Sequence, residues 1–210
     1  MKTLHLNIYF LIIIPFACCF SNHLSAKEKP AINGNHVQWV KNNGQLDKNT
    51  AYYTSTFNGN VYISNDKEIV YDITVGENIQ IRAIEKFINQ NSSSNLFAQN
   101  IGNTKINYFI GEKDNWQSNV PAYNDLKFNE VWDNIDVKLI TSGDNIEKVF
   151  YLHPNANPSD IRMGFSENAR LSVSDEGELE IKIAEKTFSF TKPIAYQIID
   201  GKKQMINVEY

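Results

Sequence analysis

The chain has 210 residues, a formal net charge of −4 at neutral pH and a hydrophobic content of 42%. This mildly acidic balance offers no basic surface for a nucleic-acid backbone or for anionic lipid, so we expect no nucleic-acid partner. Both cysteines, Cys18 and Cys19, lie close to the N-terminus. The remainder of the chain therefore has no disulfide and depends on burial of apolar side chains for its stability.

The first predicted element is an N-terminal signal peptide. An apolar run over residues 8–20 is followed by the polar stretch 21–23, which is typical of a secretory signal. The run is shorter than the roughly 20 apolar residues that a membrane-spanning helix needs, so we expect no transmembrane anchor after cleavage. Cleavage after the small residue Ala26 makes residues 1–26 the signal peptide and residues 27–210 the exported domain.

Lipid attachment is the alternative fate of this segment. Phe16 and Ala17 precede Cys18 in an arrangement that resembles a bacterial lipoprotein site, which makes Cys18 or Cys19 the candidate for modification. With either fate we expect the domain to be secreted or held at the cell surface.

Residues 27–210 are predicted to form an all-β, antiparallel β-sandwich. In the segment 178–183 apolar and charged residues alternate, and residues 69–75 alternate in the same way, which indicates strands with one face in the core. The predicted strands cover residues 51–57, 60–64, 68–75, 79–87, 105–110, 122–129, 136–141, 146–152, 161–165, 171–174, 178–183, 186–190, 194–199 and 204–210.

Short turns separate these strands. Asn58-Gly59, Ser142-Gly143-Asp144, Glu176-Gly177 and Asp200-Gly201 contain residues that tolerate positive φ, so each predicts a tight reversal. The segment 157–160 is predicted to form one helical turn, because Asn157 is a good cap and Pro158 suits the first helical position.

Two features bear on domain organisation. The polar run 89–95 is predicted to form a mobile loop, and it leaves open whether the sandwich is one large unit or two lobes. Residues 206–210 still alternate like a strand where the sequence stops, so we expect the domain to be truncated at its C-terminal end, as a fragment of a longer protein.

Several stretches of the sequence, taken together, resemble one family. They are NYFIG at 107–111, WQSNVPAY at 116–123, VWDNIDV at 131–137, FYLHPNANPSDIRMGF at 150–165 and KPIAYQ at 192–197, with WVKNNGQ at 39–45 as a fainter match. The family is the domain of unknown function at the N-terminus of secreted bacterial proteins that carry SBBP beta-propeller repeats.

This resemblance covers roughly residues 36–210 and implies an exported surface module from a Bacteroidetes-type bacterium. The family has no assigned activity, so the resemblance implies no reaction. The chain departs from the family pattern at Asn155, where a glycine is usual, and at Asp133-Asn134, where Pro-Gly is usual. These positions are in predicted turns, which Asn and Asp also form.

The sequence predicts no catalytic residue, no metal site and no cofactor. Of the histidines only His36 and His153 follow the signal peptide, and they are far apart in sequence without a cysteine to join them. We expect His153 to end a strand. The oxygen-rich pairs Asp144-Asn145 and Asp175-Glu176 lack the ligand alternation of a calcium loop and are predicted to be hairpin turns.

The candidate ligand-binding residues are Trp116, Trp132, Asp133 and Asp136. The acidic residues Asp125, Glu130, Asp133 and Asp136 offer the only candidate carboxylate cluster for glycoside chemistry, although turn formation explains Asp133 and Asp136 as well. Tryptophan faces stack on sugar rings but also fill sandwich cores, and the core interpretation is stronger for Trp132 than for Trp116.

We therefore predict an exported, non-enzymatic β-sandwich module that acts as the N-terminal folding or interaction domain of a surface or secreted protein. Its expected partner is a protein or a glycan at the cell surface. The alternative is a carbohydrate-binding or carbohydrate-processing domain, which requires a groove lined by exposed aromatic residues near Trp116.

Overall fold

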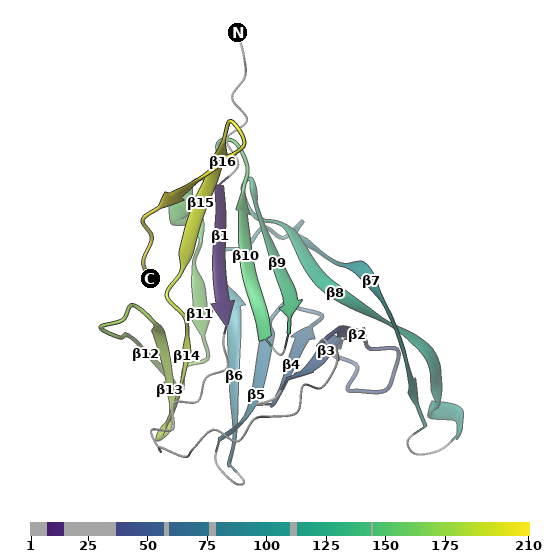
Figure 1. Ribbon diagram of the computed structural model, residues 1–210. Coiled ribbons are helices and arrows are strands. Elements are labelled where there is room, and N and C mark those ends of the chain that lie inside the picture. Colours follow the sequence, from purple (N-terminus) through teal and green to yellow (C-terminus); the bar gives the residue numbers. More distant parts are fainter. Residues whose placement is uncertain (1–7, 15–36, 57–58, 76–78, 110–112, 144) are drawn as a thin grey trace, which may run out of the picture.

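The computed structural model describes residues 8–14, 37–56, 59–75, 79–109, 113–143 and 145–210 (Figure 1). Nearly all regular structure in these ranges is antiparallel β-sheet, and two single turns of 3-10 helix, η1 (Lys113–Asn115) and η2 (Pro158–Asp160), are the only helical elements there. The predicted all-β class is confirmed.

The strands form one 13-stranded sheet and one three-stranded sheet. The large sheet contains β1 (Ile8–Ile14), β2 (Trp39–Lys41), β3 (Thr50–Thr56), β4 (Gly59–Ser64), β5 (Ile69–Val75), β6 (Ile79–Phe87), β7 (Asn95–Tyr108), β8 (Gln117–Trp132), β9 (Ile135–Ser142), β10 (Asn145–Leu152), β11 (Met163–Phe165), β15 (Ile194–Ile199) and β16 (Lys202–Ile206). The small sheet contains β12 (Ala169–Val173), β13 (Leu179–Ile183) and β14 (Lys186–Phe190).

The large sheet folds into two layers because β8 belongs to both. Along one edge β8 pairs with β7. Along its other edge, residues 125–128 and Trp132 pair with β9, whereas Ala122 and Tyr123 pair with β2. Strands β9 and β2 thus follow one another along the same edge of β8, and the sheet divides there into two halves.

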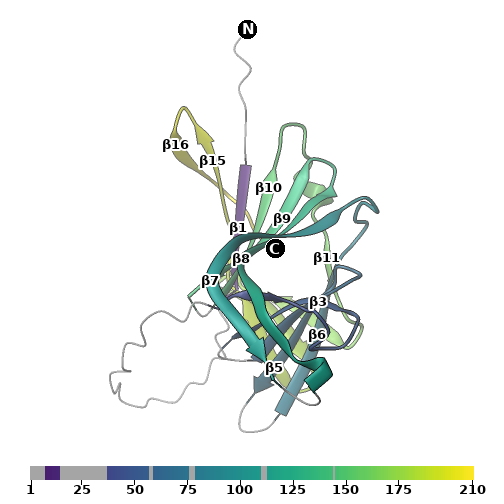
Figure 2. The same ribbon diagram turned by 90° about the vertical axis from the view of Figure 1, so that its right-hand side faces the viewer.

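The first layer consists of β2 to β6 with β11 at its edge, and the second layer consists of β9, β10, β1, β15 and β16. Figure 1 shows the blue strands β3 to β6 behind the green strands β9 and β10. The long hairpin of β7 and β8, called the arm below, curves across the view in Figure 2.

A continuous core fills the space between the layers. The Phe87 ring of the first layer packs edge-to-face on Phe128 and Trp132 of β8, with centroid distances of 5.1 and 5.7 Å. The small sheet covers one side of this core, because its Phe188 and Phe190 rings pack on Tyr71 of β5. Buried residues from before and after the segment 89–95 belong to the same cluster.

Most predicted strands are present within a few residues of their expected bounds. The predicted turn at 157–160 is also confirmed, since the Asn157 side chain accepts a hydrogen bond from the Ser159 amide and caps η2. At Asp200-Gly201 both residues have positive φ, as the tight reversal requires. Residues 58 and 144 of two other predicted turns lie outside the described residues.

The N-terminal apolar run takes part in the large sheet. Residues 8–14 form β1, which lies between β10 and β15, whereas we predicted this run to be part of a signal peptide. The signal peptide and its cleavage stay predictions, as Ala26, Cys18 and Cys19 fall in the range 15–36, outside the described residues.

Two other predictions differ from the structure. The segment 89–95, predicted as a mobile loop, is held by backbone hydrogen bonds from Asn91 to Val131 and from Ser94 to Asn91, and the Ser94 side chain is buried. A strand predicted at 105–110 is the end of the much longer β7, which begins at Asn95.

Candidate functional site

The two tryptophans proposed as ligand-binding residues lie at opposite ends of β8. Trp116 immediately precedes this 16-residue strand and Trp132 is its last residue. At about 3.3 Å per residue a fully extended strand of this length measures roughly 50 Å, which is the upper limit of their separation. The structure therefore does not bring Trp116 into one site with Trp132, Asp133 and Asp136.

Trp116 forms an exposed aromatic cluster at the end of the arm. Its ring packs edge-to-face against Phe109 at a centroid distance of 5.2 Å, and the Lys113 Nζ lies 5.9 Å from the ring centre. The exposed fractions are 57% for Phe109 and 41% for Trp116. We call Phe109, Lys113 and Trp116 the tip cluster.

Local structure positions the tip cluster. The Trp116 amide donates to the Lys113 carbonyl at 3.1 Å, which closes the turn of η1 and brings the lysine over the indole. At the start of the tip the hydroxyl of Tyr108 is hydrogen-bonded to that of Tyr53 on β3, and their rings are 6.3 Å apart. The arm is thus tied to the first layer immediately before Phe109.

This arrangement has a clear chemical capacity. Exposed aromatic faces stack on flat apolar groups, including the apolar face of a sugar ring, and a cation beside them adds a donor for hydroxyl or carboxylate groups. Sequence reasoning selected Trp116 but missed Phe109 and Lys113 as its neighbours. Phe109 and Lys113 come close to Trp116 because the chain reverses at the tip of the arm. The predicted strand 105–110 was not paired with the segment after it, so this reversal was missed.

Trp132 belongs to the core. Only 4% of it is exposed, and its Nε1 donates to the Ile88 carbonyl at 2.9 Å. The neighbouring Asp133 is exposed and accepts a hydrogen bond from the Asn91 side chain at 3.1 Å. Both residues thereby attach the segment 88–91 to the end of β8, which is a structural task.

Asp136 is the centre of a buried polar cluster at the start of β9. Its Oδ2 contacts the Lys127 Nζ at 2.7 Å and the His153 Nε2 at 2.9 Å, and its Oδ1 accepts from the Glu130 amide at 2.7 Å. Burial by itself would raise the pKa of Asp136, but the hydrogen bonds from Lys127, Glu130 and His153 outweigh burial and hold this pKa below its usual value. An ionised carboxylate with these partners anchors the chain and does not donate a proton.

The remaining acidic candidates do not add a second carboxylate to this cluster's contacts. Asp125 is buried and is bound instead by the Lys138 Nζ at 3.3 Å and by the Asn100 side chain. Glu130 is exposed and has a positive φ of 45°. Each buried aspartate is therefore neutralised by its own lysine, on neighbouring strands β8 and β9.

A third polar cluster, which the sequence did not reveal, spans the two layers. The Lys148 Nζ of β10 contacts both carboxylate oxygens of Glu85 on β6 at 2.5 Å, and the Tyr71 hydroxyl donates to Glu85 at 2.7 Å. Burial lowers the pKa of Lys148 against the opposing influence of Glu85, and burial raises the pKa of Tyr71. The sequence pattern of β10 does not predict this ion pair, because Lys148 occupies a core-facing position between Ile146 and Phe150, where an apolar residue is expected.

Two further findings concern the described ranges alone. Within them no group of three or more histidine, cysteine, aspartate or glutamate side chains is arranged to hold a metal ion. The same ranges contain no helix with the length and apolar character to span a membrane.

These features define an antiparallel β-sandwich domain with a projecting aromatic arm and paired, buried charges. The chain belongs to the family described as a domain of unknown function, DUF7948, which matches residues 39–210. The match begins at β2 and includes the arm, the first layer, the small sheet and every strand of the second layer except β1. No curated protein and no solved structure is significantly similar to the chain.

Proposed function

We propose that the chain is an exported, non-enzymatic interaction module and that it binds its partner at the cell surface through the tip cluster. The observation that carries this proposal is the exposed pair Phe109 and Trp116 at the end of a hairpin that projects from the sandwich. Aromatic side chains, tryptophan above all, are among the residues that protein interfaces favour as anchors.

Export is proposed on the sequence. The apolar run 8–20 with a small residue at Ala26 supports a cleaved leader, and the resemblance to N-terminal domains of SBBP-repeat proteins supports a Bacteroidetes-type surface protein with further domains. The domain would then serve as the N-terminal folding or interaction unit of that longer protein. Lipid attachment at Cys18 or Cys19 is the alternative route to the same surface.

A role in contact is favoured over a role in catalysis by the state of the acidic side chains. Asp125 and Asp136 are each bound to a lysine, and Glu85 is bound to Lys148 inside the core. The pKa of Asp136 is held below its usual value, whereas a general acid at neutral pH needs a raised pKa.

Carbohydrate binding is the second candidate, because the exposed Phe109–Trp116 pair also suits the apolar face of a sugar. It shares the site of the first proposal and differs only in the partner. The two are separated by the ligand that Trp116 binds.

The test compares the protein with Trp116→Ala and Phe109→Ala in pull-downs on cellulose, chitin, β-glucan and whole cells of the producing bacterium. We expect each variant to bind about 5- to 30-fold more weakly to the recognised material, since truncation of an aromatic anchor costs about 1–2 kcal/mol. Leu171→Ala on β12, which is also an exposed apolar residue, is the matched control and should bind normally. Equal binding by all variants would refute the tip cluster as the site.

Export is tested separately by the N-terminal sequence of the protein recovered from the medium and from the envelope. A start at Lys27 supports the cleaved leader, and loss of fatty-acid labelling in Cys18→Ser or Cys19→Ser supports the lipoprotein. Recovery of a protein that begins at Met1 from the cytoplasm would contradict both.

A further inference from the structure

The segment that the export proposal removes occupies a position inside the second layer. Strand β1 pairs antiparallel with β10 along its whole length, from Ile8 opposite Leu152 to Ile14 opposite Ile146. On its other edge it pairs with β15, from Ile8 opposite Gln197 to Leu11 opposite Ile194. Figure 1 shows β1 in purple between these two strands.

Removal of β1 leaves β10 and β15 each without a neighbour along one edge. The backbone of β10 loses a partner over seven residues, 146–152. Among the described strands β15 pairs only with β1 and β16, so the hairpin of β15 and β16 loses its connection to the sheet. Unpaired backbone groups and newly exposed apolar side chains both favour capture of another strand.

The acceptor strand β10 determines what suits this position. Its residues Ile146, Phe150 and Leu152 are almost fully buried, and directly opposite residues in an antiparallel pair lie on the same face of the sheet. An occupant therefore needs apolar side chains at alternate positions, in register with these three. It runs antiparallel to β10, and a length of seven residues pairs with residues 146–152 of that strand.

The position also restricts the form of the occupant. It has hydrogen-bonding strands on both sides, β10 and β15, so the occupant must present two free edges. A strand at the edge of another folded sheet has one free edge only. A single extended segment fits, whereas the sheet edge of a second copy of this chain does not.

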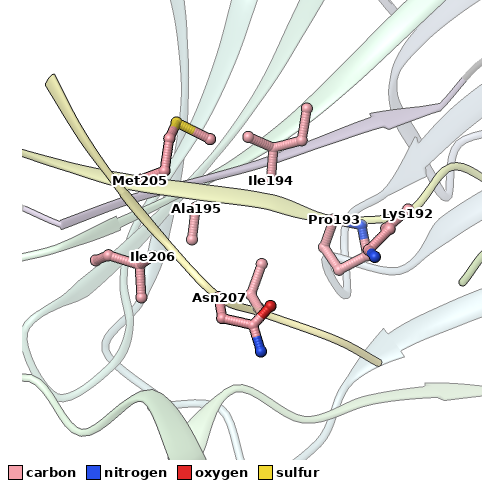
Figure 3. A pocket seen from close by; sticks show the side chains of 8 residues that line it. Lys192, Pro193, Ile194, Ala195, Met205, Ile206 and Asn207 are labelled. Atoms are coloured by element: carbon pink, nitrogen blue, oxygen red, sulfur yellow. The ribbon is translucent and has the colours of Figure 1, made fainter.

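The hairpin of β15 and β16 lies next to this position, and among the described strands β16 has no neighbour on its other edge. Residues of β15 and β16 and of the adjoining segments, including Pro193, Ile194, Met205 and Ile206, line a mainly apolar pocket, and β1 runs behind them in Figure 3. Ile194, Ile198 and Met205 are exposed. The hairpin thus has apolar contacts to offer to a segment that enters next to it.

We propose that the exported domain receives, at the position of β1, an apolar strand donated by a partner polypeptide. This inference rests on the proposed function, because the position becomes vacant only when residues 1–26 are removed. Pairing by strand addition combines main-chain hydrogen bonds with side-chain selection at alternate positions. The partner is thus a chain with an extended segment of seven or more residues in which alternate side chains are apolar.

The test starts from the full chain with a protease site inserted after Ala26. After cleavage the protein is unfolded in denaturant, separated from residues 1–26 by gel filtration, and refolded with or without a fluorescent peptide of residues 8–14 that carries three added lysines for solubility. The uncleaved chain, refolded in parallel, provides the reference. A peptide with Phe10→Asp and Ile14→Asp, at the positions opposite Phe150 and Ile146, is the matched control.

We expect one peptide to bind per chain and to restore the circular dichroism and melting temperature of the uncleaved chain. The control peptide should bind at least about tenfold more weakly, since each charge enters an apolar position. Refolding to the reference state without any peptide would overturn the proposal, and so would failure of the peptide to bind. Formation of dimers without peptide would overturn it in favour of a second copy. Export plays no part in this experiment, so its outcome is independent of the N-terminal sequence.

Discussion

At the scale of single residues, the buried pair of Lys148 and Glu85 is a contact whose disruption has a large energetic consequence. Each side chain is only 2% exposed, and the pair joins β10 in the second layer to β6 in the first. The Lys148 ammonium also lies 5.0 Å from the centre of the Phe190 ring, which places the small sheet against the same charge. Three parts of the fold therefore meet at one ion pair.

We expect Lys148→Met to lower the free energy of unfolding by about 3–5 kcal/mol, because it leaves the Glu85 carboxylate buried without a cation. The double variant Lys148→Met/Glu85→Met should recover most of this loss, because no unpaired charge remains. Urea unfolding followed by tryptophan fluorescence measures both. Equal destabilisation in the single and double variants would contradict the assignment.

The matched control for this prediction is the exposed pair of Arg82 and Asp72. Its atoms are also 2.5 Å apart, but 64% of the arginine side chain is exposed. Solvent screens such a pair, so Arg82→Ala should change the free energy of unfolding by less than about 1 kcal/mol. Because the two ion pairs have the same interatomic distance, the difference between their effects on the free energy of unfolding reports the effect of burial.

At the scale of the elements, the hairpin of β3 and β4 depends on a glycine at its turn. Gly59 has a φ of +145°, and a Cβ added there would lie 2.0 Å from the carbonyl oxygen of Asp72 on β5. The residue thus permits both the reversal from β3 to β4 and the close approach of β5. Gly143 also has positive φ, but a Cβ there would meet no atom within 4 Å.

We expect Gly59→Ala to destabilise the domain by more than about 2 kcal/mol, as the β-carbon forces the backbone of β4 away from β5. Gly143→Ala, the control, should cost only about 1 kcal/mol, the strain of an alanine in the left-handed region. Thermal unfolding monitored by circular dichroism compares the two variants. Equal melting temperatures would show that the sheet shifts to accept the methyl group.

The elements also show what sequence patterns can and cannot predict. Strands such as β5 and β13 were predictable because their apolar, core-facing residues alternate with polar, solvent-facing ones. The part of β7 before residue 105 was missed because none of its residues is fully buried, and Asn95, Asn100 and Asn103 weaken the apolar alternation of Leu96 and Ala98. The three-residue β2 is too short to show any period.

The candidate site was partly predictable for a similar reason. Trp116 was selected because it is an aromatic residue in a polar segment, and this is a local property. Its contacts with Phe109 and Lys113 depend on the reversal of the arm, and the separation of Trp116 from Asp136 depends on the length of β8. The pair of Lys148 and Glu85 depends on two layers that meet across the core, which no local pattern encodes.

At the scale of the whole molecule, the two layers and the small sheet share one cluster of buried residues. Strand β8 contributes Leu126, Phe128 and Trp132 to it, the first layer contributes Phe87, and the small sheet contributes Phe190. The cluster leaves no boundary near residues 89–103 at which the domain divides into separate lobes.

We therefore expect a single cooperative unfolding transition. Near-ultraviolet circular dichroism, which reports the buried Trp39 and Trp132, and far-ultraviolet circular dichroism, which reports the strands, should give the same midpoint in urea. Two separate midpoints would contradict a shared core and indicate independent lobes.

Because β8 pairs with strands of both layers, its late position in the chain has a consequence for the order of folding. Strands β3 to β6 follow one another by short connections and pair with their neighbours, so they form early as the chain emerges from N-terminus to C-terminus. Their docking onto the rest waits for β8, since β2 pairs with Ala122 and Tyr123 there. Until that late strand arrives, the inner face of the meander has no cover. The exposed apolar side chains of this face make such an intermediate prone to aggregation until β8 has docked.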